Sequence, residues 1–336
     1  MKVVIPLAGK GTRLRPHTHT RPKPLIPVAG KAILGHILDR IKPLEVSEVI
    51  FIVGDMWEQI KQYVDTNYKF KTRYIEQKEL LGDGYAINLA REYIDEDVLV
   101  IFVDTIFETD LGIIKHAKDD GIIWVSKVDD PNRFGVVVLD KKKHITKIVE
   151  KPETFVSDLA VIGLYYFKDY KLMLDSLEYV IEHKITSKGE YRLADTMQVM
   201  IEKGSKLKAE NVKKWLDCGK PETMLSTNRY LLENGYSKTV KTINSVVIPP
   251  VNIADNVKII NSIIGPYVSI AEYSEIQNAI ITNCIIGERA LVEDVALSES
   301  IIGKDAVVKD FFKKLNVGDN SEVIYSNNHH KIIGDK

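Results

Sequence analysis

One short phrase recurs in the C-terminal part of the chain and restricts its fold more than any other feature. An aliphatic residue is followed by glycine, and aliphatic or small residues follow at fixed intervals. The copies begin at Ile264, Ile286, Ile302 and Val317, and a copy without the glycine begins at Ile253. Their glycines are 22, 16 and 15 residues apart. This spacing predicts one solenoid coil per repeat, with an insertion in the first coil.

These repeats resemble the hexapeptide repeats of left-handed parallel β-helices. In such a coil the aliphatic side chain points inward and the glycine turns the corner. An ordinary β-sandwich with coincidental Ile-Gly pairs is the alternative. Because Pro249-Pro250 marks the entrance, we place the domain boundary within residues 236–246 and the β-helix domain at residues 244–328.

The N-terminal part, residues 1–238, alternates short β-branched runs with segments of helical periodicity. The expected strands are Val3–Leu7, Val49–Val53, Arg73–Ile75, Val98–Val103 and Ile145–Val149, and helical spacing runs from Ile33 to Ile41 and from Ala86 to Ala90. This order predicts an α/β domain with a Rossmann-like, mostly parallel sheet and helices on both faces. Since such sheets bind ligands at the carboxyl ends of their strands, chemistry is expected after Leu7, Ile75 and Val103.

Overall composition excludes several classes of protein. The 336 residues include 46 Lys or Arg against 47 Asp or Glu, so no basic surplus indicates nucleic acid or an anionic membrane as a partner. Two cysteines are too few for a disulfide framework and fit a reducing compartment. No apolar run approaches the length of a membrane span. We therefore expect a soluble, cytoplasmic protein.

A glycine turn, Gly9-Lys10-Gly11-Thr12-Arg13, directly follows the first expected strand. Leu14 stands where a dinucleotide fingerprint has its third glycine, and no Gly-Lys-Ser/Thr follows, so neither a dinucleotide nor a Walker loop fits. The turn exposes backbone N–H groups next to Arg13, which suits an anionic phosphate chain. A plain tight turn is the alternative.

The charge around this turn favours the phosphate interpretation. Between Met1 and Leu38 there is no Asp or Glu, and the basic residues are Lys2, Lys10, Arg13, Arg15, Arg21, Lys23 and Lys31. Prolines at 22, 24 and 27 predict that Lys23 is held in a stiff, extended segment. A solvated basic face is the alternative to a polyphosphate site.

The segment from Leu7 to Pro16, followed by Pro22-Lys23-Pro24-Leu25, resembles the signature of the sugar-1-phosphate nucleotidylyltransferases. These enzymes, which include glucose-1-phosphate thymidylyltransferases, make NDP-sugars, and several carry a C-terminal left-handed β-helix. The likeness covers about residues 1–235. It continues in the same order at Gln77 with Gly82, Asp104, Phe134-Gly135-Val136-Val137, Glu150-Lys151-Pro152, Gly163-Leu164-Tyr165 and Trp215-Leu216-Asp217-x-Gly219.

The resemblance implies a reaction and a role for each matching residue. A nucleoside triphosphate and a sugar-1-phosphate would give an NDP-sugar and pyrophosphate, with Mg²⁺ as cofactor. The implied catalytic residues are Arg13, Lys23 and Lys151. The implied nucleotide-binding residues are Leu7, Ala8, Gly9, Gly11, Thr12, Gln77 and Gly82, the sugar-binding residues are Gly135, Glu150 and Gly163, and the metal ligands are Asp104 and Asp217.

The identity of the substrates is less constrained. The Gln77 amide can pair with a pyrimidine edge, so dTTP or UTP is favoured, and glucose-1-phosphate is the default sugar of the family. Val103 replaces a usual glycine, and Asp83 adds an acid near the expected nucleoside. An alternative is therefore a catalytically weak or inactive regulatory homologue that binds NDP-sugar.

The repeats could add a second activity or support the first domain. Acyltransferases built on such repeats generally use a β-helix histidine, and residues 184–328 contain none. We expect the repeats to serve in a homo-oligomer or to pack under the catalytic domain.

Overall fold

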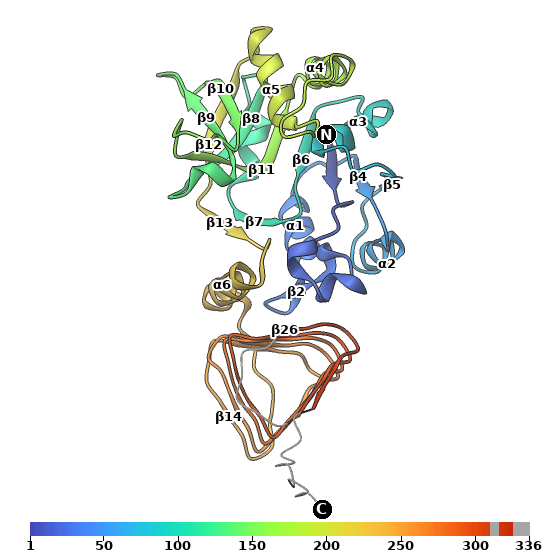
Figure 1. Cartoon of the computed structure of the whole chain (residues 1–336), viewed down its shortest axis with the longest axis vertical. Helices are drawn as coiled ribbons and strands as arrows, with labels where there is room; N and C mark the ends of the chain where they lie inside the picture. Colours follow the sequence, from blue (N-terminus) through green and yellow to red (C-terminus); the bar gives the residue numbers. More distant parts are fainter. Residues whose placement is uncertain (310–315, 325–336) are drawn as a thin grey trace, which may run out of the picture. The chain divides into compact units, whose positions relative to one another are not determined.

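The computed structural model describes residues 1–309 and 316–324 of the chain (Figure 1). Two compact units are present, and each is built from two separate stretches of sequence. Unit 1 consists of Met1–Lys10 and Ile33–Leu216, whereas unit 2 consists of Gly11–Ala32 and the chain from Asp217 onward. The second half of the glycine turn thus belongs to the same compact unit as the repeats.

Unit 1 is built on a mixed sheet in the order β10-β9-β11-β6-β1-β4-β5, with β8 pairing to β11 and β12 to β8. The strands are β1 (Lys2–Pro6), β4 (Glu48–Val53), β5 (Thr72–Glu76), β6 (Val98–Ile101), β8 (Gly121–Lys127), β9 (Gly135–Leu139), β10 (Ile145–Glu150), β11 (Leu159–Phe167) and β12 (Leu207–Asn211). Neighbours are parallel from β5 through β4 and β1 to β6. Strand β11 runs antiparallel to β6, β8 and β9. The predicted α/β, Rossmann-like fold class is confirmed.

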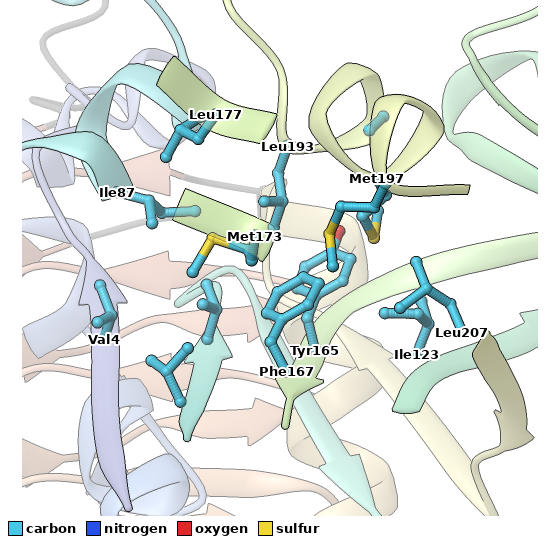
Figure 2. Close-up of a cluster of buried hydrophobic side chains, with 14 of the residues drawn as sticks. Val4, Ile87, Ile123, Tyr165, Phe167, Met173, Leu177, Leu193, Met197 and Leu207 are labelled. Carbon is cyan, nitrogen blue, oxygen red and sulfur yellow. The ribbon is translucent and has the colours of Figure 1, made fainter. Parts of the chain in front are cut away.

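Helices cover both faces of this sheet. Val3, Val4 and Ile5 are all fully buried, which requires cover on both sides because successive strand residues point to opposite faces. Figure 2 shows one side, where residues of α3, α4 and α5 lie over Val4 and Phe167. The helices of the unit are α1 (Ile33–Ile41), α2 (Trp57–Asn67), α3 (Asp83–Asn88), α4 (Tyr170–Glu182) and α5 (Leu193–Glu202).

The predicted elements lie close to the observed ones. The helix from Ile33 to Ile41 is reproduced at both ends, and the first strand is displaced by one residue. The strand expected over Val98–Val103 ends at Ile101, because Val103 and Asp104 form a turn into β7 (Thr105–Glu108). Strand β7 pairs with β13 (Lys214–Asp217) in a separate small sheet.

In unit 2, the described coils form three parallel sheets, the arrangement of the predicted left-handed β-helix (Figure 1). The β15 sheet contains β15 (Val251–Ile253), β18 (Val268–Ile270), β21 (Ile285–Ile286), β24 (Ile301–Ile302) and β26 (Asn316–Val317). The β16 sheet contains β16 (Lys258–Ile260), β19 (Glu275–Gln277), β22 (Leu291–Glu293), β25 (Val307–Lys309) and β27 (Glu322–Ile324). The β14 sheet contains β14 (Val246–Val247), β17 (Ile263–Ile264), β20 (Ile280–Thr282) and β23 (Ala296–Ser298).

The remaining elements of unit 2 precede the coils. These are the strand pair β2 (Pro27–Val28) and β3 (Lys31–Ala32), helix α6 (Pro221–Leu231), and the short helical segments η1 (Thr12–Leu14), η2 (His17–His19), η3 (Lys23–Leu25) and η7 (Leu232–Tyr236). None of the helices in the part of the chain that the structure describes is long and apolar enough to cross a membrane.

The predicted insertion in the first repeat is wrong. In the β15 sheet Ile253 aligns with Ile270, Ile286, Ile302 and Val317. Ile264 instead lies in the β14 sheet, at a different corner of the coil. The apparent gap arises because the Ile-Gly phrase occurs at two kinds of corner, while each coil keeps nearly the same length.

The corners between the β16 and β14 sheets are formed by stacked polar residues. Asn244, Asn261, Asn278 and Asp294 all have positive φ, the left-handed conformation that asparagine tolerates better than most residues. Asn244 donates to Asn261 over 2.8 Å, Asn261 to Asn278 over 3.3 Å, and Asn278 to Asp294 over 2.8 Å. This ladder links successive coils outside the hydrophobic core.

Candidate active site

The carboxyl ends of the parallel strands in unit 1 bring together the first predicted nucleotide-binding residues. Leu7 N–H donates to the Ile52 carbonyl over 2.6 Å, and Gln77 N–H donates to the Val53 carbonyl over 2.8 Å. Both residues thus continue neighbouring strands into loops at the same edge. Gln77 is buried, and its side-chain amide donates to the Glu79 carbonyl over 3.0 Å, which orients the amide.

Gly54, which the sequence reasoning did not single out, lies against the Ala8 backbone at this edge. A Cβ on Gly54 would lie 3.0 Å from the Ala8 carbonyl oxygen. The loop after β4 therefore packs against the glycine turn after β1. A glycine that follows a buried strand was the available signal.

Gly82 is required by the backbone opposite it. Its φ is +121°, and a Cβ there would lie 2.3 Å from the Tyr191 carbonyl oxygen. Tyr191 N–H donates to the Leu81 carbonyl over 2.8 Å, and Gly84 N–H donates to the Tyr191 carbonyl over 2.9 Å. The loop at residues 81–84 and the segment around Tyr191 are thereby joined backbone to backbone.

Asp83 has structural partners in the same junction. Its Oδ2 accepts from Arg192 Nη1 over 2.9 Å, and its Oδ1 accepts from Leu193 N–H over 2.6 Å at the start of α5. Arg192 also pairs with Glu190 over 2.7 Å. The acid that departs from the family pattern thus helps to fix this loop, so it no longer motivates the regulatory alternative.

The predicted sugar-binding residues Gly135 and Glu150 face each other across β9 and β10. A Cβ on Gly135 would lie 2.9 Å from Glu150 Oε2, so the glycine leaves room for that carboxylate. Lys151 Nζ lies 3.4 Å from Glu150 Oε1. Lys151 also has a positive φ of 44°, which is unfavourable for a residue with a side chain.

Gly163 and Asp104 belong to adjacent segments of unit 1. Gly163 has a φ of +82°, a Cβ there would lie 2.9 Å from Phe102 Cβ, and its carbonyl accepts from Phe102 N–H. Asp104 follows Phe102 by two residues in the sequence.

Burial raises the pKa of the Tyr165 hydroxyl well above its usual value, and the charges of three nearby carboxylates act in the same direction. These carboxylates are Asp83, Glu150 and Asp104. Three acidic groups therefore lie close enough to this buried hydroxyl to act on it electrostatically.

In unit 2 the glycine turn closes on Lys23. Gly11 has a φ of +58°, and a Cβ there would lie 3.0 Å from Thr18 Cγ2 and 3.1 Å from Lys23 Cβ. The Thr18 hydroxyl donates to the Gly11 carbonyl over 3.0 Å. The predicted extended conformation of Lys23 is wrong: it begins the short turn η3, because the Leu25 N–H bonds back to the Pro22 carbonyl.

Arg13 and Asp217 come together in the same unit. A Cβ on Gly219 would lie 2.8 Å from Asp217 Oδ1 and 3.5 Å from both terminal nitrogens of the Arg13 guanidinium. Gly219 N–H donates to Asp217 Oδ1 over 2.8 Å and orients that carboxylate. Arg13 and Thr12 are exposed, as residues that meet a ligand must be.

Two members of the predicted basic cluster have other partners. Lys2 is buried and pairs with Glu48 over 3.2 Å and with Asp95 over 3.3 Å. Arg21 lies 3.4 Å from Glu288 and 4.0 Å from Asp319, both on the repeats. For these two residues the excess of basic charge in sequence does not indicate a phosphate ligand.

Comparison with known proteins identifies the family. The family model described as "Nucleotidyl transferase" matches residues 2–234. The chain belongs to the nucleotidyl transferase family. Its match includes every residue that the sequence resemblance placed in the site, from Leu7 to Asp217.

The chain is similar in sequence to proteins of Methanocaldococcus jannaschii and Haloferax volcanii. It is 40% identical to the "Bifunctional protein GlmU" of Methanocaldococcus jannaschii over 237 residues, which are 69% of this chain and 55% of that protein. It is 33% identical to "UTP–glucose-1-phosphate uridylyltransferase AglF" of Haloferax volcanii, over 66% of this chain and 93% of that protein. The chain spans little more than half the length of the GlmU proteins that it matches.

A solved structure has a similar fold. A UDP-glucose pyrophosphorylase in complex with UDP-glucose gives a TM-score of 0.62 at 23% identity, over 69% of this chain and 98% of that one. This likeness supports the Rossmann-like fold of the nucleotidyl transferase segment.

Proposed function

We propose that this protein is a sugar-1-phosphate nucleotidylyltransferase, which converts an NTP and a sugar-1-phosphate into an NDP-sugar and pyrophosphate. The observation that carries the proposal is the second half of the glycine turn, residues 11–13, with its neighbours in unit 2. Gly11 packs on Lys23, and Arg13 lies beside Asp217, so two cations and a carboxylate accompany a turn of exposed backbone. Family membership over residues 2–234 supports the same reaction class.

The attacking group in this reaction is a phosphate oxygen that is already anionic, so no general base is needed. The protein must instead align two anions that repel each other and neutralise the α-phosphate during in-line attack. Arg13 and Lys23 are proposed to hold the NTP phosphates, and Lys151 the phosphate of the sugar. Lys151 is suited to this role because its ion pair with Glu150 and its fixed backbone limit its movement.

The ligand pockets are proposed from the same residues. Leu7, Ala8, Gly9, Gly11, Thr12, Gln77 and Gly82 would bind the nucleotide, and Gly135, Glu150 and Gly163 the sugar. The oriented Gln77 amide can donate to and accept from a pyrimidine, so UTP or dTTP is proposed as the nucleotide and glucose-1-phosphate as the sugar.

Asp104 and Asp217 are the proposed ligands of Mg²⁺. Within the described residues no group of three or more His, Cys, Asp or Glu side chains is arranged to hold a metal. Mg²⁺ commonly binds through one or two carboxylates together with substrate phosphates and water, and two aspartates fit that demand. When bound, the ion would neutralise charge on the phosphates.

The organisation of the protein is proposed as follows. Residues 1–238 form the proposed catalytic domain and residues 244–328 the proposed β-helix, of which residues 310–315 and 325–328 lie outside the described part. A cytoplasmic location is proposed because two cysteines, Cys218 and Cys284, are too few for a disulfide framework. A homo-oligomer is proposed to form through the β14 sheet, where Val246, Ile263 and Ile280 align in register and are exposed.

The experiment that tests the function is pyrophosphate release across a panel of NTPs and sugar-1-phosphates. We expect turnover with a pyrimidine nucleotide and a hexose-1-phosphate, at a rate that depends on Mg²⁺. Tight binding of NDP-sugars without turnover for any pair would overturn the proposal and favour the regulatory alternative.

A further inference from the structure

The outward face of the β15 sheet differs from that of the β14 sheet although both carry isoleucine at equivalent positions. Ile263 and Ile280, which point outward from the β14 sheet, are 39% and 49% exposed. Ile285 and Ile301, which point outward from the β15 sheet, are 2% and 3% exposed. Ile26 and Pro27 line a small cavity together with Ile285 and Ile301. The segment at residues 11–32 thus covers this face.

The last described coils hold that segment through a buried carboxylate. Asp319 Oδ2 accepts from the Thr20 hydroxyl over 2.7 Å and lies 4.0 Å from Arg21 Nε. Its other oxygen, Oδ1, accepts from Lys304 N–H over 2.7 Å. The Asp319 side chain is 8% exposed. One carboxylate therefore bonds to the preceding coil, at Lys304, and to the segment at the same time.

Two further contacts lie beside it. His17 Nε2 hydrogen-bonds to Asn316 Oδ1, and the Asn316 amide donates to the Arg15 carbonyl over 3.4 Å. A Cβ on Gly318 would lie 2.8 Å from Pro16 Cβ, so this glycine permits the close approach. The contacts fall on residues 15–21, between the predicted phosphate-binding residues Arg13 and Lys23.

The other end of the segment is held by a buried amide. Asn228 on α6 is fully buried, and its Oδ1 accepts from Ala29 N–H over 2.8 Å and from the Ser269 hydroxyl over 2.6 Å. Its amide nitrogen donates to the Tyr267 carbonyl over 3.2 Å. Both ends of the stretch that carries Lys23 are therefore fixed to the repeats.

We infer that the β-helix positions residues 11–13 of the glycine turn for catalysis, and that Asp319 is the positioning residue. The inference rests on the proposed function and assigns the repeats a part in it. We assign Asp319 no contact with the substrate. It acts through Thr20 and Arg21, which hold residues 11–23 in the conformation where Gly11 packs on Lys23.

A reaction that depends on alignment is sensitive to such an anchor. Displacing a charge by about 1 Å from its position can lower a rate by roughly 10²-fold. Loss of the anchor should lower kcat more than it raises KM, because the cations contribute most when charge develops in the transition state.

The test compares Asp319→Asn with a matched control, Glu293→Gln. Glu293 is also a carboxylate on a coil, paired with Lys309 over 3.0 Å, but it lies on the β16 sheet. Hydrogen exchange of the full-length variants is measured alongside pyrophosphate release. We expect Asp319→Asn to accelerate exchange in residues 11–27 and to lower kcat by about tenfold or more, and the control to change neither.

A second variant, Arg21→Gln, removes the other partner of the ion pair between Arg21 and Asp319. If Asp319 acts through Arg21, the double variant should lose little more activity than either single variant. Unchanged exchange in residues 11–27, or additive losses of activity, would overturn the inference. If the wild-type protein releases no pyrophosphate, the proposed function fails, while the exchange experiment still shows whether Asp319 fixes the segment.

Discussion

Glu150 and Tyr191 lie where they do because glycines face them. Gly135 leaves space for the Glu150 carboxylate, and Gly82 leaves space for the Tyr191 carbonyl. Gly82 combines two requirements, a positive φ and a close approach. Gly204 has a φ of +93° as well, but a Cβ there would meet nothing within 4 Å. The two positions therefore separate backbone strain from steric conflict.

We predict that Gly82→Ala destabilises the protein far more than Gly204→Ala. The second change should cost about 1 kcal/mol from the left-handed backbone alone. The first change also places a Cβ 2.3 Å from the Tyr191 carbonyl oxygen, which accepts a hydrogen bond from Gly84 N–H. This contact forces the 81–84 loop to move. Urea unfolding of both variants measures the difference. Equal midpoints would contradict this account of Gly82.

Lys23 offers a direct test of the phosphate site. We predict that Lys23→Ala keeps the fold, because alanine retains the Cβ that packs against Gly11, and lowers kcat by a factor on the order of 10². Steady-state kinetics of the variant measure this effect. The control is Lys258→Ala, which removes a lysine exposed on β16. Near wild-type kcat/KM in Lys23→Ala would argue against the assigned role.

Reasoning from sequence proposes residues whose side chains suit the chemistry, but it does not reveal residues that the geometry requires. Asp104 is proposed as a site residue because a carboxylate after an apolar strand is unusual. Gly54 could not be ranked above other glycines, since its need depends on how near the Ala8 backbone comes. Asp83 was misleading, because its partners Arg192 and Leu193 are about 110 residues away in sequence.

At the scale of elements, the coils of the β-helix depend on their corners as well as on their core. We predict that Asn278→Ala is more destabilising than Asn278→Gly, by about 1 kcal/mol, although both remove the ladder hydrogen bonds. Glycine tolerates the positive φ of this corner and alanine does not. Thermal unfolding compares the pair. If alanine is the less destabilising change, the positive φ of this corner does not determine the stability of the β-helix.

The contact between η2 and β26 predicts a dependence on pH. Burial lowers the pKa of His17 below its usual value of 6.5, and Arg21 acts in the same direction, while Asn316 and Asp319 oppose it. The folded protein therefore binds fewer protons at His17 than the unfolded chain does. The contribution of neutral His17 to the free energy of unfolding is therefore fully present above about pH 6.5. It is lost as the pH falls through the lowered pKa of the folded protein. His17→Gln should flatten this part of a stability-against-pH curve; an unchanged slope would exclude His17 as its source.

The strands and helices were largely predictable because they follow local periodicity, as α1 shows. The register of the repeats was not, because the Ile-Gly phrase at Ile264 and at Ile286 looks the same in sequence but lies in different sheets. Likewise, the prolines around Lys23 restrict the backbone, but the turn that forms there depends on the hydrogen bond from the Leu25 N–H to the Pro22 carbonyl.

At the scale of the whole molecule, the predicted site residues are divided between the two units. Gln77, Glu150 and Lys151 belong to unit 1, whereas Arg13 and Lys23 belong to unit 2. The sequence predicts a boundary near residues 236–246, because helical periodicity fades and the repeats begin there. The attachment of residues 11–32 to the repeats depends on pairs such as Thr20 and Asp319, about 300 residues apart, which no local pattern reveals.

The most direct test of the account follows the α-phosphate of the nucleotide. UTP or dTTP labelled at that phosphate is incubated with glucose-1-phosphate, Mg²⁺ and the full-length protein. The account predicts that the label appears in an NDP-sugar, with one unlabelled pyrophosphate released per product and no release when the sugar phosphate is omitted. Label that stays in the triphosphate, or that is released as nucleoside monophosphate whether or not sugar phosphate is present, would contradict it.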